Sequence, residues 1–307
     1  MAAVVVDGKA AAQRIRAEVR ERVRLLREKG LIPCLGVILV GEDPASLSYV
    51  TAKAKALEEA GMTSRDLRLP ADTGEDALLA HIAGLNRDPA VQGILVQLPL
   101  PSHIREDRVI SAIDPRKDVD GFHPVSVGNL VLGKPGFVPC TPQGVAALLR
   151  EMNVPIAGAH VVVVGRSNIV GKPLVNLLSR RDFNATVTLC HTGTRDLAAY
   201  TRQADILIAA AGKAGLITAD MIREGAAVID VGVNRVPDPA AKKGYRLKGD
   251  VDFEGAVERA SVITPVPGGV GPMTIAMLLR NLAQAAEDWG AGGSKALGDK
   301  SPGDKSP

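Results

Sequence analysis

Lys53 is the residue of this chain whose surroundings best suit proton transfer. A helix is predicted from Pro44 to Ala60, and at 100° per residue it places Lys53 on one stripe with Tyr49 and several alanines. Burial among apolar groups disfavours the ammonium form, which moves the pKa of a lysine toward neutrality and suits it to general acid–base catalysis. The alternative is a lysine that buries its stem and keeps its ammonium in water, which is the commoner case for an isolated residue.

Two further polar residues stand beside predicted turns. Gln97 ends a predicted strand before a proline-stiffened turn, and Asp120 lies in the segment from Lys117 to Pro124, where carboxylates precede a tight turn. Strand ends are where the sites of α/β proteins collect. Gln97 is suited to hold Lys53 or a reacting group, and Asp120 to pair with the amino-pyrimidine edge of a heterocycle. Capping of the two turns is the alternative role.

The segment from His160 to Pro173 is predicted to be a buried strand, a glycine-bounded turn and a helix start, the setting of a dinucleotide-binding turn. Ser167 stands in place of the usual middle glycine, and Gly171 comes one residue late. The next strand ends without the Asp or Glu that binds the ribose hydroxyls of NAD. The hydroxyl of Thr192 and the guanidinium of Arg166 favour a 2′-phosphate instead, so we expect NADP. A structural turn with solvated loop residues is the alternative.

The run from Thr264 to Thr274 has three Gly and three Pro among its eleven residues. Such a composition fits neither a helix interior nor a central strand, so it predicts a shaped loop that opens a helix. Glycine lets a flat ligand approach the main chain closely, which indicates the wall of a small-molecule site. A tight strand-to-helix turn is the commoner origin of such clusters.

The elements that position these residues alternate helical periodicity with short Val/Ile/Leu runs, which is typical of parallel sheets covered by helices. We expect an α/β protein of two domains, the second a Rossmann-like parallel sheet, with a ligand cleft between them. The expected domains are residues 1–145 with 275–290 for catalysis, residues 146–274 for the nucleotide, and a disordered tail at 291–307. The expected helices are 9–29, 44–60, 141–152 and 275–289, and the expected strands are 35–40, 93–98, 160–164, 186–189, 206–209 and 228–231.

The overall composition excludes several classes of partner. A net charge of +3 with 3% aromatic residues provides neither a basic stripe nor a stacking platform for nucleic acid. The three scattered cysteines indicate a reducing compartment, and the five histidines lack metal-ligand spacing, so we expect no metal. No apolar run reaches the roughly 18 residues that span a bilayer. We therefore expect a cytoplasmic protein without a membrane partner.

Six motifs in this order resemble the bifunctional methylenetetrahydrofolate dehydrogenase/cyclohydrolase family, over about residues 3 to 285. They are Tyr49 with Lys53, VQLPLP at 96–101, KDVDGFHP at 117–124, PCTP at 139–142, GRSNIVGKP at 165–173 and TPVPGGVGPMT at 264–274. The resemblance implies oxidation of 5,10-methylenetetrahydrofolate with NADP, hydrolysis of the product to 10-formyltetrahydrofolate, and a homodimer. The fused synthetase domain of some members of that family is absent from this sequence, so we expect no ATP-dependent ligation.

The resemblance also implies roles for particular residues. Lys53 would carry the proton transfers of the cyclohydrolase, with Tyr49 against the folate and Gln97 tuning the lysine. The other implied folate contacts are Asp120, which would anchor the pterin ring, and Pro267, Gly268 and Gly269, which would line the pocket. The implied NADP contacts are Gly165, Arg166, Ser167, Thr192 and Val233.

Two other functions remain open from the residues alone. A catalytically silent sensor of folate or NADP would keep the cleft but would need no proton shuttle, and Lys53 argues against it. An NADP-linked shikimate or quinate dehydrogenase has a similar two-domain architecture and also uses a catalytic lysine. Turnover with shikimate would separate that enzyme from a folate enzyme, because fold resemblance alone does not.

Overall fold

The computed structural model describes residues 3–241 and 244–296. The chain divides into two compact units: unit 1 contains Met1–Arg16 and Asp120–Leu278, and unit 2 contains Ala17–Val119 and Leu279–Pro307. Two helices, α1 (Gly8–Glu28) and α10 (Val270–Ala296), each have residues in both units. None of the helices within the described ranges is long and apolar enough to cross a membrane.

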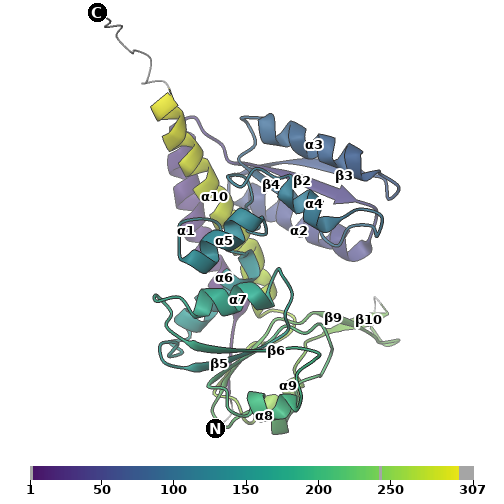
Figure 1. Ribbon diagram of the computed structural model, residues 1–307, viewed down its shortest axis with the longest axis vertical. Helices are drawn as coiled ribbons and strands as arrows, with labels where there is room; N and C mark the ends of the chain where they lie inside the picture. The colour runs from purple at the N-terminus through teal and green to yellow at the C-terminus, as the bar shows by residue number, and fades with distance from the viewer. Residues whose placement is uncertain (1–2, 242–243, 297–307) are drawn as a thin grey trace, which may run out of the picture. The chain divides into compact units, whose positions relative to one another are not determined.

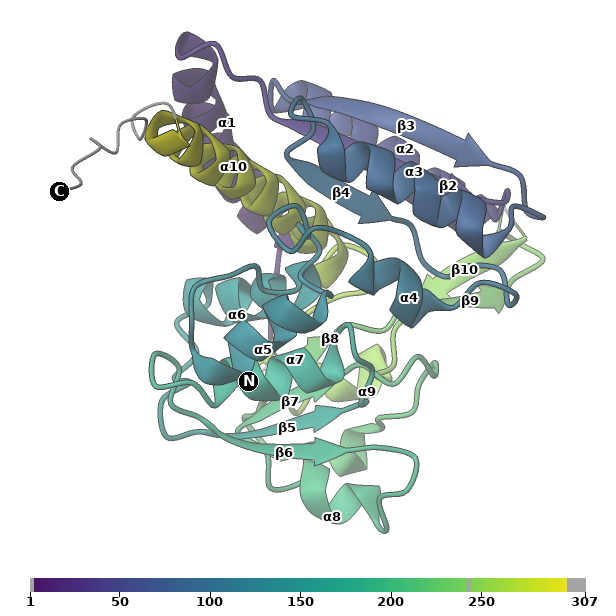
Figure 2. The ribbon, with the colours of Figure 1, turned by 45° about the horizontal axis from the view of Figure 1, so that its top comes forward.

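Unit 2 is built on a three-stranded parallel sheet in the order β3-β2-β4. Its strands are β2 (Cys34–Val40), β3 (Thr63–Leu69) and β4 (Gly93–Val96), and its shorter helices are α2 (Pro44–Glu59), α3 (Glu75–Arg87) and α4 (Glu106–Ser111). Every residue of β2 and β4 is buried, as expected for apolar strands covered on both faces. Figures 1 and 2 show α2 and α3 on opposite faces of this sheet.

The unit 2 part of α1 packs alongside α10, as Figures 1 and 2 both show. Arg22 donates from Nε and Nη2 to the two carboxylate oxygens of Glu287, at 2.8 and 2.7 Å. Arg280 on α10 pairs with Glu18 on α1 at 3.1 Å. The two-pronged Arg22 contact is the stronger geometry for a guanidinium and a carboxylate, and it fixes the register of the two helices.

Lys117 is a cation of unit 2 with 0% of its surface exposed. Its Nζ donates to the carbonyl oxygens of Leu85 at 2.9 Å and Asp88 at 2.7 Å, at the carboxyl end of α3. It also lies 4.9 Å from the centre of the Trp289 ring on α10. A helix C-terminus favours a cation because its last carbonyls lack helical partners. Burial lowers the pKa of Lys117, and the charges of Asp114 and Asp88 oppose that shift.

We expect Lys117→Met to lower the free energy of unfolding by about 2 kcal/mol. Two charge-assisted hydrogen bonds and a cation–π contact are lost, while relief of the buried charge limits the effect. The midpoint of urea unfolding measures it. Lys29→Met removes an exposed lysine and is the control, expected within about 0.5 kcal/mol of wild type. Equal stability of the two variants would contradict a stabilising role for Lys117.

Unit 1 is built on a six-stranded parallel sheet in the order β1-β11-β8-β7-β5-β6. Its strands are β1 (Val4–Val5), β5 (His160–Val164), β6 (Thr186–Cys190), β7 (Ile206–Ala209), β8 (Ala227–Asp230) and β11 (Val262–Ile263). From β5 the chain moves outward to β6 and then returns to the other side of β5 with β7. The strand order therefore reverses between β5 and β7, and open α/β sheets bind ligands at the carboxyl ends of their strands at such a point.

Helices cover both faces of this sheet, as Figure 1 shows. The helices are α5 (Pro124–Leu132), α6 (Cys140–Glu151) and α7 (Gly171–Leu178) on one side, and α8 (Leu197–Thr201) and α9 (Phe253–Ala256) on the other. Val162 and Val164 of β5 belong to the core cluster against which Leu197 of α8 and Phe253 of α9 pack. A 3-10 turn (Ala219–Met221) and an antiparallel hairpin of β9 (Asn234–Pro237) and β10 (Tyr245–Lys248) complete the unit.

The predicted α/β class and the parallel Rossmann-like sheet are confirmed. The expected strands and the helices before residue 260 agree with the structure within about two residues at each end. The sequence reading missed β3, a strand of alternating exposure whose Arg and Asp residues hid its apolar pattern. It also missed the two-residue strands β1 and β11, which are too short to show a period, and the β9–β10 hairpin, whose strands contain Asn, Arg and Lys.

The last helix is longer at both ends than predicted. α10 begins at Val270, so the final five residues of the Gly/Pro run are helical and the loop ends at Gly269. Pro272 fits there because N–H groups in the first turn have no helical partner. The helix continues to Ala296, so residues 291–296 are not the disordered segment expected, and residues 297–307 lie outside the described residues. The predicted domain boundary at residue 145 stays a prediction; the compact units divide after Val119.

Candidate active site

Lys53 lies on α2 in unit 2 and is only 7% exposed. Its Nζ donates to Oε1 of Gln97 at 3.0 Å and lies 5.1 Å from the centre of the Tyr49 ring. An ammonium over an aromatic face is attracted by the ring quadrupole. The structure therefore brings together the lysine, amide and tyrosine that the sequence singled out. The low exposure argues against a lysine whose head stands free in water.

Helix α2 presents Lys53 through a well-defined start and a buried face. Asp43 caps the helix, since its Oδ2 accepts from the backbone N–H of Ser46 at 2.8 Å. The buried face follows helical spacing through Ser46, Val50, Lys53, Leu57 and Ala60. The predicted stripe is corrected in one respect: Tyr49 is 38% exposed, and Ala52 is exposed as well. Tyr49 thus stands at the rim of the buried face, where a planar ligand can reach its ring.

Gln97 follows β4 and is oriented by the main chain on both sides. Its backbone N–H donates to the carbonyl of Ile38 at 2.8 Å, and its side-chain Nε2 donates to the carbonyl of Leu98 at 2.7 Å. Because the amide nitrogen is used there, the amide oxygen faces Lys53. An acceptor aimed at Nζ gives the lysine side chain a fixed direction.

Asp120 lies in unit 1, at the amino end of α6. Cys140, the first residue of that helix, donates from Sγ to Asp120 Oδ1 at 3.9 Å, a weak thiol hydrogen bond. The turn after Asp120 requires glycine, because Gly121 has φ +74° and a Cβ there would lie 2.7 Å from the backbone of Pro139. Asp120 as a whole is half-buried.

Pro267, Gly268 and Gly269 form the end of the loop before α10. Gly268 has φ +110°, a conformation that favours glycine, and Pro267 is exposed. A Cβ on Gly8 would overlap the carbonyl oxygen of Gly269, so the start of α1 lies directly against this loop. Gly8 was not among the site residues predicted from the sequence. The pattern that could have indicated it is a glycine directly after Asp7, whose carboxylate caps α1 by accepting two backbone N–H groups.

The predicted nucleotide turn directly follows β5, at the point where the strand order reverses. Gly165 has φ +125°, and a Cβ there would overlap the carbonyl oxygen of Ala210, which follows β7. Gly171 packs in turn against the carbonyl of Gly165. Ser167 accepts from the backbone N–H groups of Val170 and Gly171 at 3.2 and 3.3 Å. The serine hydroxyl therefore shapes the turn that a glycine shapes in the usual motif.

The other predicted cofactor residues are accessible around this turn. Arg166, Thr192 and Val233 are all exposed. His191 fixes the loop that carries Thr192. Its ring Nδ1 accepts from the backbone N–H of Gly193 at 3.0 Å, and its backbone N–H donates to Thr194 Oγ1 at 2.8 Å. A fixed loop can present the Thr192 hydroxyl in one direction.

Two buried carboxylates at the same end of the sheet were not predicted from the sequence. Asp230 ends β8 and is 4% exposed, and Asp250 is 0% exposed. Burial raises the pKa of Asp230 to about 6, while N–H groups of Val251, Asp250 and Gly232 pull it down. The sequence pattern that could have indicated these carboxylates is an aspartate with a glycine close by, which occurs twice, in Asp230-Val-Gly232 and in Gly249-Asp250.

The raised pKa of Asp230 predicts that its contribution to stability falls as the pH rises through about 6. Folding favours the protonated form of a carboxyl whose folded-state pKa lies above its unfolded value of about 3.9. Between pH 4 and pH 7.5, the free energy of unfolding of wild type should fall by up to about 3 kcal/mol relative to Asp230→Asn. Urea unfolding of both proteins across this range measures the trend. A difference that does not change with pH would contradict it.

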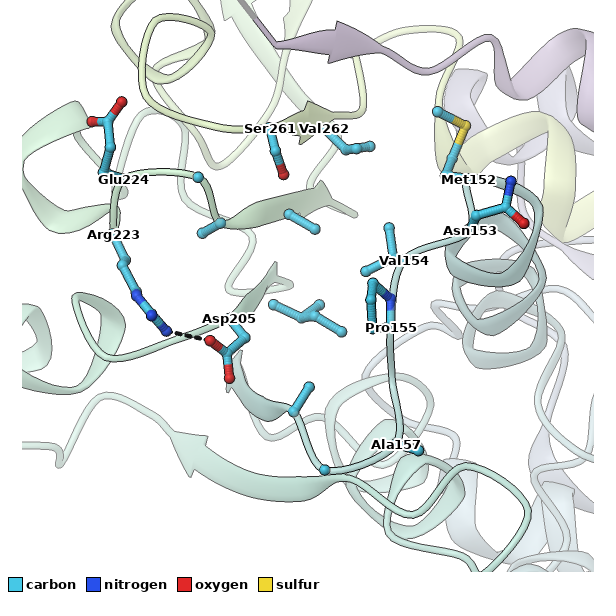
Figure 3. A pocket seen from close by; sticks show the side chains of 16 residues that line it. Met152, Asn153, Val154, Pro155, Ala157, Asp205, Arg223, Glu224, Ser261 and Val262 are labelled. Atoms are coloured by element: carbon cyan, nitrogen blue, oxygen red, sulfur yellow. Dashed lines mark hydrogen bonds and ion pairs between the residues drawn. The ribbon is translucent and has the colours of Figure 1, made fainter. Parts of the chain in front are cut away.

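A pocket of about 540 Å³ lies at the opposite end of this sheet (Figure 3). Its floor includes Ile206 and Ala227, the first residues of β7 and β8. Arg223 and Asp205 form an ion pair at one side. Ligands of open α/β sheets bind at the carboxyl ends of the strands, so this pocket is not the predicted cofactor site.

Among residues 3–241 and 244–296, no three His, Cys, Asp or Glu side chains lie close enough together to hold a metal ion.

Two family models together match most of the chain. Residues 6–120 match the model of the tetrahydrofolate dehydrogenase/cyclohydrolase catalytic domain. Residues 139–289 match the model of the NAD(P)-binding domain of the same family.

The chain belongs to the tetrahydrofolate dehydrogenase/cyclohydrolase family. A bifunctional protein FolD from Exiguobacterium sibiricum is 60% identical over 93% of this chain and 100% of its own length. The bifunctional FolD structure from Campylobacter jejuni has a TM-score of 0.89 at 49% identity, covering 94% of this chain and 99% of that one. The Trypanosoma brucei FolD, complexed with NADP cofactor and inhibitor, has a TM-score of 0.90 at 44% identity over 94% and 98% of the two chains.

Membership of the tetrahydrofolate dehydrogenase/cyclohydrolase family confirms the predicted resemblance and the predicted class of enzyme, a bifunctional dehydrogenase and cyclohydrolase. It favours catalysis over the silent sensor. It also separates the chain from the shikimate dehydrogenases, which the sequence alone left open. The second domain is the NAD(P)-binding domain, as the turn at Gly165 predicted.

Proposed function

We propose that this enzyme oxidises 5,10-methylenetetrahydrofolate to 5,10-methenyltetrahydrofolate with NADP and then hydrolyses the product to 10-formyltetrahydrofolate. The observation that carries the proposal is the contact of the buried Lys53 with Gln97, within a chain that belongs to the bifunctional family. A sensor would have no use for a buried ionisable group that is held by an amide.

The oxidation needs positioning more than acid–base chemistry. Hydride leaves the methylene carbon for the nicotinamide, and the remaining cation is shared by the two neighbouring nitrogens, so no proton is transferred. Binding energy that aligns the two reactants supplies the rate. Asp120 would hold the pterin, and Pro267, Gly268 and Gly269 would line its pocket.

The hydrolysis does need a proton carrier. Water attacks the methenyl carbon and loses one proton. The hydroxyl so formed loses the second proton as the formyl carbonyl forms, and the ring nitrogen gains a proton as its bond to that carbon breaks. Lys53 is suited to these transfers, since the residue is buried and its Nζ has a fixed acceptor in Gln97. Over the whole step one water is consumed and one proton is released. Tyr49, at the rim beside Nζ, would stack on or orient the folate.

We propose NADP as the preferred cofactor. Thr192 and Arg166 offer a hydroxyl and a guanidinium, and β6 ends without the carboxylate that would repel a 2′-phosphate. Gly165, Ser167 and Val233 would complete the contacts at the same end of the sheet. We also propose that the enzyme is a cytoplasmic homodimer that acts on tetrahydrofolate derivatives without nucleic-acid or membrane partners.

One assay tests the central claim. Purified enzyme is mixed with methylenetetrahydrofolate and NADP while NADPH and methenyltetrahydrofolate absorbances are followed together, and the assay is repeated with NAD. NADPH formation without accumulation of the methenyl compound supports both activities. Accumulation would leave only the dehydrogenase, and absence of NADPH would overturn the proposal. Equal rates with NAD would contradict the cofactor preference.

A further inference from the structure

Asp230 and Asp250 of unit 1 form an interlocked pair that the proposed chemistry does not use. A Cβ on Gly232 would overlap Oδ1 of Asp250, and a Cβ on Gly249 would overlap Oδ2 of Asp230. Each carboxylate therefore occupies the space left by a glycine of the other segment. The backbone N–H of Asp250 also donates to Oδ1 of Asp230 at 2.9 Å.

Every carboxylate oxygen of the pair accepts at least one N–H. Asp250 Oδ2 accepts from the backbone of Ala211 at 2.6 Å and Gly212 at 2.8 Å, and its Oδ1 accepts from Asn234 Nδ2 at 2.9 Å. Asp230 Oδ1 also accepts from the N–H of Gly232 at 3.0 Å, and its Oδ2 accepts from Val251 at 2.9 Å. Buried carboxylate oxygens that accept several N–H groups hold the main chain in place.

The loops that the pair holds lie beside the nucleotide turn. Ala211 and Gly212 follow β7, on one side of the reversal in strand order, and Gly165 follows β5 on the other. Ala210 lies directly against Gly165, since its carbonyl oxygen fills the place of a Cβ there. A shift of the loop at 210–212 would therefore be transmitted to the turn at Gly165. Asn234 is also the neighbour of Val233, another predicted cofactor residue.

We propose that Asp250, supported by Asp230, is a positioning residue for the nicotinamide cofactor: it fixes the loop after β7, and through it the turn at Gly165, in the shape that binds the dinucleotide. The inference rests on the proposed NADP-dependent function. It assigns Asp250 no contact with the reacting atoms, because the side chain is fully buried and its oxygens are occupied.

The test is Asp250→Asn, which has one oxygen where the carboxylate has two. That oxygen can serve either the Ala211 and Gly212 N–H groups or Asn234, so one of the two loops loses its partner. We expect the Kd for NADPH, measured by its fluorescence, and the dehydrogenase KM for NADP to rise by about tenfold to a hundredfold. The cyclohydrolase, assayed with methenyltetrahydrofolate and no nucleotide, should stay within about twofold of wild type.

Asp205→Asn is the matched control, because Asp205 is an aspartate at the other end of β7 that accepts from the N–H of His160 at 2.8 Å. It should leave the Kd for NADPH unchanged. If Asp250→Asn loses the cyclohydrolase as well, Asn234→Ala replaces it, with an expected rise in Kd of about threefold to tenfold. Unchanged NADPH binding by the variant that retains cyclohydrolase overturns the inference. Failure of wild type to bind NADPH would instead overturn the proposed function.

Discussion

Replacing Lys53 by methionine is expected to abolish the cyclohydrolase, lowering its kcat by about a thousandfold or more, while part of the dehydrogenase survives. General acid–base groups contribute roughly a hundredfold to ten-thousandfold, and hydrolysis needs such a group whereas hydride transfer does not. Methionine preserves most of the length of the side chain in a position that is 7% exposed, so the fold of α2 is kept. Its loss of charge also leaves Oε1 of Gln97 without this donor.

The two activities of Lys53→Met are measured separately. Hydrolysis is followed by the decay of methenyltetrahydrofolate in the absence of nucleotide, and oxidation by formation of NADPH and the methenyl compound. The matched control is Lys55→Met, on the same helix, where the lysine is exposed and pairs with Glu59 at 3.9 Å. It should leave both activities unchanged. Equal loss of both activities in Lys53→Met would show that Lys53 mainly binds or positions the substrate.

The burial of Lys53 could be predicted from the sequence because helical periodicity is local. One turn of α2 already separates the face with Lys53 from the face with the exposed Lys55. Gln97 could be found for a similar reason, since an amide directly after an apolar strand of a parallel sheet stands at a strand end. The sequence could suggest the contact between Lys53 and Gln97 but could not establish it, because the two residues are 44 positions apart and only the tertiary structure brings them together.

The residues that the sequence did not reveal act through long-range packing. In the sequence Lys117 looks like an ordinary surface lysine, and only the fold shows that it contacts the end of α3 and the ring of Trp289. Asp230 looks like a polar residue in an apolar strand and Asp250 like a loop carboxylate. Only the pairing of their segments shows that each carboxylate fills the space beside a glycine of the other segment. The tight approach of Gly8 to Gly269 is likewise a property of two distant segments. Local patterns carry no record of such contacts, which depend on tertiary structure.

Gly165→Ala is expected to have the opposite effect to Lys53→Met: the dehydrogenase falls by at least about a hundredfold and the cyclohydrolase remains. A methyl group at Gly165 would overlap the carbonyl oxygen of Ala210, and the φ of +125° is unfavourable for alanine. The turn must therefore move away from the loop after β7, which removes the close backbone approach that a dinucleotide needs. The assays are those used for Lys53→Met, with the Kd for NADPH added.

Gly158→Ala is the control that separates the backbone strain of a positive φ from the steric overlap expected at Gly165. Gly158 also has a positive φ, +77°, but no atom lies within 4 Å of the place where its Cβ would be. It precedes β5, at the end of the sheet away from the turn, so Gly158→Ala should lose some stability and keep NADPH binding. Equal loss of NADPH binding in both alanine variants would mean that the turn at Gly165 has no special role. If instead Gly165→Ala alone loses the dehydrogenase and Lys53→Met alone loses the cyclohydrolase, the two steps depend on separate residues: oxidation on the shape of a backbone turn in unit 1, and hydrolysis on a buried amine in unit 2.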